Sequence, residues 1–119
     1  MAKILVIDDE PSVLASIEQA LKTAGHKVSS AGGGSEAIRR FQEDPADLLI
    51  TDIFMPEKDG FEIIAHFRKQ FPNVPIIVIS GNPRGNSLDV ATKLGAAAAI
   101  SKPFSVEELL GAVNGTLKA

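Results

Sequence analysis

Short apolar segments alternate with longer amphipathic segments along the whole chain. The expected strands cover residues 3–8, 27–31, 47–51, 76–79 and 97–100. The segments between them place apolar residues at helical spacing, as Val13, Ile17 and Leu21 show. Strands that alternate with helices in this way predict repeated βα units and a parallel sheet.

Proline, glycine and serine mark the expected ends of the helices. Pro11 suits the first turn of a helix, and Gly25 suits the position just after its end. Ser35 and Ser105 are the expected N-caps of the second and the last helix. The expected helices cover residues 11–24, 36–44, 59 or 60 to 71, 86–94 and 106–117. The last helix is expected to bury Val106, Leu109, Leu110, Val113 and Leu117.

The pattern predicts one α/β domain over residues 1–119, a doubly wound five-stranded parallel sheet with helices on both faces. The third and fourth apolar segments are apolar throughout, which is typical of central strands that are buried on both sides. Right-handed crossovers then place helices on both faces of the sheet. Ligands of such sheets bind outside the carboxyl ends of the strands.

Polar side chains follow four of the expected strands at that edge. Asp8 and Asp9 come at the end of the first strand, Asp52 follows the third, Ser80 the fourth and Lys102 the fifth. An Asp-Asp pair alone also fits an acidic turn that caps a helix. Together with a third acid and a lysine, it predicts a site for a divalent cation and a phosphoryl group.

The residue types at this edge suit phosphoryl transfer to a carboxylate. Neighbouring carboxylates repel one another unless a cation joins them, and Mg²⁺ prefers hard oxygen ligands. The carboxylate of Asp52 can attack phosphorus and form an acyl phosphate. Lys102 can stabilise the charge of the phosphoryl oxygens, and Ser80 can donate a hydrogen bond to one of them.

Composition excludes several other functions. The net charge of −3 and the pI near 5.3 argue against binding to nucleic acid, because no basic excess is available to neutralise phosphates. The chain has no cysteine, so thiolate and disulfide chemistry are excluded. No signal peptide and no apolar segment of membrane-spanning length is recognisable, so we expect a cytoplasmic protein that does not bind membranes.

At this point the chain resembles the receiver domain of two-component response regulators. The resemblance covers the whole chain and its motifs occur in family order. They are Ile7-Asp8-Asp9-Glu10, Asp52 with Met55-Pro56 and Asp59-Gly60, Ile79-Ser80-Gly81, Gly95-Ala96 and Ser101-Lys102-Pro103-Phe104.

The resemblance implies a strand order of 2-1-3-4-5 and a role for each site residue. It implies that Asp52 is the phosphoacceptor and that Asp8, Asp9, Asp52 and the Phe54 carbonyl hold Mg²⁺. Ser80 would be the switch hydroxyl and Lys102 the lysine that contacts the phosphoryl group. The donor would be a sensor histidine kinase or a histidine phosphotransfer protein. The phosphorylated domain, a monomer or weak dimer, would then act on a downstream protein.

One position departs from the family pattern. Three residues before the lysine the family usually has Tyr or Phe, whereas this chain has Ala99. The usual aromatic switch is therefore missing, and a pseudo-receiver that binds proteins without phosphate remains an alternative. A third hypothesis is an enzyme with an aspartyl-phosphate intermediate. Such enzymes usually place a second Asp two residues after the nucleophile, where this chain has Phe54, so we expect a signalling domain that is not an enzyme.

Overall fold

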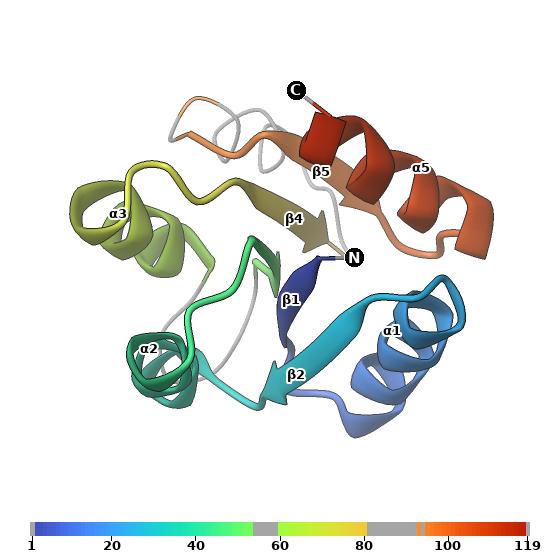
Figure 1. Ribbon diagram of the computed structural model, residues 1–119, viewed down its shortest axis with the longest axis horizontal. Helices are drawn as coiled ribbons and strands as arrows, with labels where there is room; N and C mark the ends of the chain where they lie inside the picture. The colour runs from blue at the N-terminus through green and yellow to red at the C-terminus, as the bar shows by residue number, and fades with distance from the viewer. Residues whose placement is uncertain (1, 54–59, 81–92, 94, 119) are drawn as a thin grey trace.

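The computed structural model describes residues 2–53, 60–80, 93 and 95–118, and it shows the expected doubly wound sheet (Figure 1). Five parallel strands form one sheet in the order β2-β1-β3-β4-β5. The strands are β1 (Lys3–Ile7), β2 (Lys27–Ala31), β3 (Leu48–Asp52), β4 (Ile76–Ser80) and β5 (Ala98–Ser101). The described helices are α1 (Pro11–Thr23), α2 (Gly34–Glu43), α3 (Gly60–Gln70) and α5 (Val106–Lys118). The helix expected at residues 86–94 lies outside the described residues, apart from Lys93.

The side chains of β1, β3 and β4 alternate between two cores, one on each face of the sheet. Leu5 and Ile7 pack with α2 and α3, whereas Ile4 and Val6 pack with α1 and α5. Figure 1 shows these two helix pairs on opposite sides of the sheet. The strands β3 and β4 are buried at every position, as their apolar sequences predict. No helix in the described part of the chain is long and apolar enough to cross a membrane.

The end of α1 and the start of α5 follow the expected capping chemistry. Gly25 follows Ala24, the C-cap of α1, with a φ of 95°, and its N–H bonds to the Lys22 carbonyl. The next N–H, of His26, bonds to the Leu21 carbonyl, which completes a Schellman motif. At α5 the Ser105 hydroxyl accepts a hydrogen bond from the Glu108 N–H at 3.0 Å.

Two expectations about the helices are wrong. The helix α2 begins at Gly34 with Gly33 as its N-cap, so Ser35 already lies inside it. Glu36 instead accepts a hydrogen bond from the Gly32 N–H at 2.7 Å. In α5, Leu109 and Val113 are buried, but Val106 is 55 % exposed. It lies in the first turn of α5 and lines a groove between this helix and α1, beside Ser16 and Ala20.

Candidate functional site

The strand register brings the carboxyl ends of four strands to one edge of the sheet. Ile7 pairs with Thr51, Asp52 pairs with Ile79, and Ser80 pairs with Ser101. The residues that follow β1 and β5 therefore meet beside the ends of β3 and β4. The backbone fixes this arrangement, because the Lys102 N–H bonds to the Ser80 carbonyl at 2.8 Å. The Lys102–Pro103 peptide bond is cis, as the Pro at this position allows.

Four carboxylates gather at this edge. Each of Asp8, Asp9, Glu10 and Asp52 has an oxygen within 4.8 Å of an oxygen of the others. Asp8 and Asp52 are buried, with 1 % and 5 % exposure, because they end or follow central strands. Asp9 and Glu10 lie in the loop before α1 and are exposed. The cluster therefore has a buried half and a half that faces solvent.

Lys102 is the cation of this cluster and contacts three of its acids. Its ammonium nitrogen Nζ lies 3.2 Å from Asp8 Oδ2, 3.5 Å from Asp52 Oδ2 and 3.7 Å from Glu10 Oε1. The lysine side chain is only 16 % exposed. One ammonium cannot neutralise four carboxylates, so the cluster keeps an excess of negative charge.

The pKa values of Asp8 and Lys102 are both raised, for different reasons. Burial raises the pKa of the Asp8 carboxyl, and this outweighs the hydrogen bond from the Glu10 N–H and the attraction of Lys102. Burial alone would lower the pKa of the Lys102 ammonium. The attraction of Asp52 and Asp8 outweighs it, so the pKa of Lys102 lies above its ordinary value.

The oxygen atoms at this edge suit a hard divalent cation. Carboxylates are the donors that Mg²⁺ and Ca²⁺ prefer, and the raised pKa of Asp8 shows that its charge is poorly compensated. A second positive charge beside Asp8 would relieve this cost. Phe54, whose carbonyl is an expected fourth ligand, lies outside the described residues.

Two of the expected site residues lie outside the carboxylate cluster. Ser80 is fully buried at the end of β4, next to the β3 end that carries Asp52. Ala99 pairs with Val78 inside β5 and is exposed.

The sequence had assigned no role to Glu10. Its position between Asp9 and Pro11 was the available signal, because it places the side chain at the first turn of α1.

Asparagine in place of Asp8 is expected to stabilise the metal-free domain. The folded-state pKa of Asp8 is raised above its ordinary value of 3.8, so the folded state binds the proton more tightly than the unfolded state. The free energy of unfolding should therefore fall as pH rises through the window between these two values. Asp8→Asn removes the cost of burying a charged carboxylate, and we expect the free energy of unfolding to rise by about 1 kcal/mol at neutral pH.

The measurement is urea unfolding followed by circular dichroism in the presence of EDTA, from pH 4 to neutral pH. Asp44→Asn is the matched control, since Asp44 is exposed and lies at the opposite edge of the sheet. An Asp8→Asn variant that is less stable than the wild type at neutral pH would show that the Lys102 contact outweighs the cost of burial.

Comparison with known proteins places this chain in one family. The family described as response regulator receiver domain matches residues 4–114. The chain is 34 % identical over 116 residues to the transcriptional regulatory protein PrrA of Mycobacterium leprae, covering 98 % of this chain and 50 % of that protein. It is 31 % identical over 116 residues to the alkaline phosphatase synthesis transcriptional regulatory protein PhoP of Bacillus subtilis, with coverage of 98 % and 48 %.

Solved structures agree with this assignment. A response regulator receiver domain protein from Clostridium thermocellum is 33 % identical, with a TM-score of 0.93 and coverage of 99 % of this chain and 95 % of that chain. The Vibrio cholerae chemotaxis protein CheY4 is 30 % identical, with a TM-score of 0.90 and coverage of 98 % of both chains.

The curated relatives are longer than this chain, which spans about half the length of PrrA and PhoP. They are named as transcriptional regulators, so these comparisons do not support the expectation, drawn from charge, that nucleic acid is excluded as a partner. The match to the family model and the identity to these relatives cover nearly all of the described sheet and helices. The chain belongs to the response regulator receiver domain family.

Proposed function

We propose that this domain is a phosphorylation-controlled switch in which Asp52 accepts the phosphoryl group. Receiver domains of response regulators are signalling domains of two-component systems. The observation that supports Asp52 is its place at the end of β3, where its Oδ2 lies 3.5 Å from Lys102 Nζ. The carboxylate is thus buried on one side and faces the only lysine in the described part of the cluster.

The residues around Asp52 suit a transfer from a phosphohistidine. An oxygen of Asp52 would form the new bond to phosphorus while the bond between phosphorus and the imidazole nitrogen breaks. The imidazole leaves with the electron pair of that bond. The ammonium of Lys102 can stabilise the charge on the phosphoryl oxygens, and the Ser80 hydroxyl can donate a hydrogen bond to one of them. We propose a sensor histidine kinase or a histidine phosphotransfer protein as the donor, and a downstream protein as the target of the phosphorylated domain.

Asp8, Asp9, Asp52 and the Phe54 carbonyl would hold Mg²⁺, which supplies positive charge to the phosphoryl oxygens when it is bound. The burial of Asp8 orients its carboxylate, because one oxygen accepts the Glu10 N–H at 2.9 Å and the other contacts Lys102. Asp9 is exposed and can turn toward the same place. Asp8 therefore serves as the rigid ligand and Asp9 as the adjustable one.

Incubation with acetyl phosphate and Mg²⁺, followed by mass spectrometry, tests the proposed function. A switch retains one phosphoryl group long enough to be detected. A pseudo-receiver, which the exposed Ala99 keeps as the second candidate, shows no mass gain. Rapid consumption of many equivalents of donor would instead indicate an enzyme.

Alanine in place of Lys102 is expected to slow phosphoryl uptake by about 100-fold, the usual effect of removing one charge-stabilising group from such a site. The fold should persist, because the lysine lies in a loop after β5 and contributes little apolar area. A mass-spectrometric time course with acetyl phosphate measures the rate.

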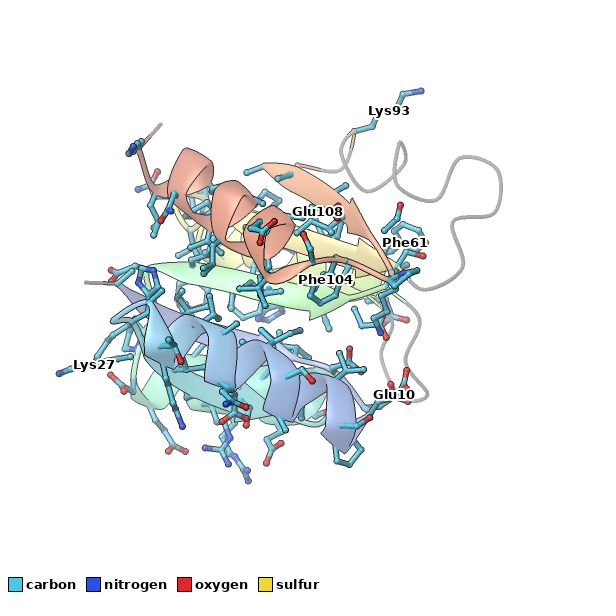
Figure 2. The ribbon with its side chains drawn as sticks, turned by 90° about the vertical axis from the view of Figure 1, so that its right-hand side faces the viewer. Glu10, Lys27, Phe61, Lys93, Phe104 and Glu108 are labelled. Carbon is cyan, nitrogen blue, oxygen red and sulfur yellow. The ribbon has the colours of Figure 1, made fainter. Side chains whose placement is uncertain are left out.

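Lys27→Ala serves as the control, because Lys27 is exposed at the beginning of β2 (Figure 2). This substitution removes the same charge far from the site. Equal uptake by Lys102→Ala and the wild type would remove Lys102 from the proposed machinery. Lys102→Arg should restore only part of the rate, because the planar guanidinium places its charge differently.

A further inference from the structure

Glu10 has an unusual position for a helix N-cap residue. Its backbone carbonyl begins α1 by accepting hydrogen bonds from Val13 and Leu14, but its side chain makes no capping hydrogen bond. The side chain instead lies beside the carboxylate cluster, with Oε1 3.7 Å from Lys102 Nζ. It is 59 % exposed, and Figure 2 shows it at the end of α1 that lies toward the carboxyl edge of the sheet.

Glu10 differs from the other two acids that contact Lys102. Asp8 and Asp52 are buried, and the proposed function assigns them to the cation and to the phosphoryl group. When Asp8 binds the cation and Asp52 carries the phosphoryl group, Glu10 is the remaining acid whose charge can still attract the Lys102 ammonium. It also stands on the side of the cluster that faces solvent, from which a donor must arrive.

We propose that Glu10 is a positioning residue that holds the Lys102 ammonium toward solvent and sets the negative charge that an incoming phosphodonor meets. This inference rests on the proposed function, because it concerns the same transfer to Asp52. In this role Glu10 slows phosphoryl uptake from anionic donors. The chemistry of the transfer is unchanged, since Asp52 forms the bond to phosphorus and acetate leaves with the electrons of the broken phosphorus–oxygen bond.

The physical reason is the sum of two charge effects. A carboxylate a few ångströms from the reacting atoms repels a donor in proportion to the donor's own negative charge. Solvent and salt screen this repulsion, because the glutamate is exposed. The same carboxylate also competes with the phosphoryl group for the single ammonium. Neutralising Glu10 therefore removes the repulsion and leaves the Lys102 ammonium to Asp8, Asp52 and the phosphoryl group.

The test compares Glu10→Gln with the wild type at saturating Mg²⁺. Uptake from acetyl phosphate, a dianion at neutral pH, should become about threefold faster, and the gain should disappear in concentrated salt. Phosphoramidate has less negative charge, so its rate should rise less than about twofold. Glu10→Asp keeps the charge and should stay near the wild-type rate. Glu43→Gln makes the same change of net charge on an exposed residue at the end of α2 and should have no effect.

A second measurement does not depend on the reaction. In the metal-free protein, the NMR signal of the Lys102 Cε–Hε group should shift in Glu10→Gln, because the ammonium loses one of its three carboxylate contacts. It should not shift in Glu43→Gln. A glutamate that served only the structure of α1 would change neither this signal nor the dependence on donor charge.

The outcomes separate this inference from the proposed function. A wild type that takes up no phosphoryl group from either donor overturns both. Normal uptake by the wild type, with the same rates and the same Lys102 signal in Glu10→Gln, overturns the role of Glu10 alone. If Glu10→Gln takes up phosphoryl groups faster by the same factor from both donors, and salt does not change this factor, an electrostatic effect of Glu10 is also contradicted.

Discussion

Replacing Asp52 with asparagine is expected to abolish phosphoryl uptake and to preserve the fold. The side chain keeps its shape, and Lys102 retains its 3.2 Å contact with Asp8. An amide oxygen is a very poor nucleophile toward phosphorus, so the rate should fall by at least about 10³-fold. Mass spectrometry after incubation with acetyl phosphate and Mg²⁺ measures the uptake, and circular dichroism confirms the fold.

The matched control is Asp44→Asn, which changes an exposed aspartate that pairs with Lys3 at the other edge of the sheet. This control should take up one phosphoryl group at the wild-type rate. Labelling of Asp52→Asn to the same extent as the control would show that another carboxylate is the acceptor. Asp9 would then be the first candidate, because it is exposed and belongs to the same cluster.

Alanine in place of Phe41 is expected to cause the largest loss of stability from a single side chain. Phe41 is 1 % exposed, and its ring centroid lies 5.0 Å from that of Phe67 and 4.6 Å from that of Phe71. These contacts join α2 to α3 and to the residue that follows α3. Deleting a fully buried phenyl ring removes apolar contacts and leaves a cavity, which costs about 4 kcal/mol.

Urea unfolding followed by circular dichroism measures this loss, since the chain has no tryptophan or tyrosine for fluorescence. Phe104→Ala is the control, because Phe104 is only partly buried and packs at the margin of the other core (Figure 2). It should cost about half as much or less. A Phe41→Ala variant that loses no more than the control would mean that the cavity between α2 and α3 collapses.

Local pattern was sufficient to predict most of the fold and which strand ends meet at the carboxyl edge of the sheet. Apolar runs of strand length, separated by amphipathic segments, leave few arrangements that bury both kinds of surface. The parallel sheet followed from this pattern, and the convergence of Asp8, Asp52, Ser80 and Lys102 followed from the sheet, because all parallel strands end at the same edge. The strand order came from the resemblance to the family and is confirmed.

Differences between neighbouring residues of the same type depended on the tertiary structure. Asp8 and Asp9 are identical in the sequence, yet only Asp8 is buried, because it continues a central strand whose neighbours cover it. Its raised pKa follows from that burial. In α5, helical spacing places Val106 on the same stripe as Leu109 and Val113, but Val106 lies at the open groove between α1 and α5 and stays exposed.

The contact between Glu10 and Lys102 also required the folded chain. These residues lie far apart in the sequence, and a glutamate before a proline is in itself an ordinary start of a helix. The two residues meet because the loop after β5 and the first turn of α1 lie at the same edge of the sheet. The sequence by itself determined which groups gather at this edge. Burial and distance, which depend on every neighbouring element, decided which of these carboxylates are buried and which face solvent.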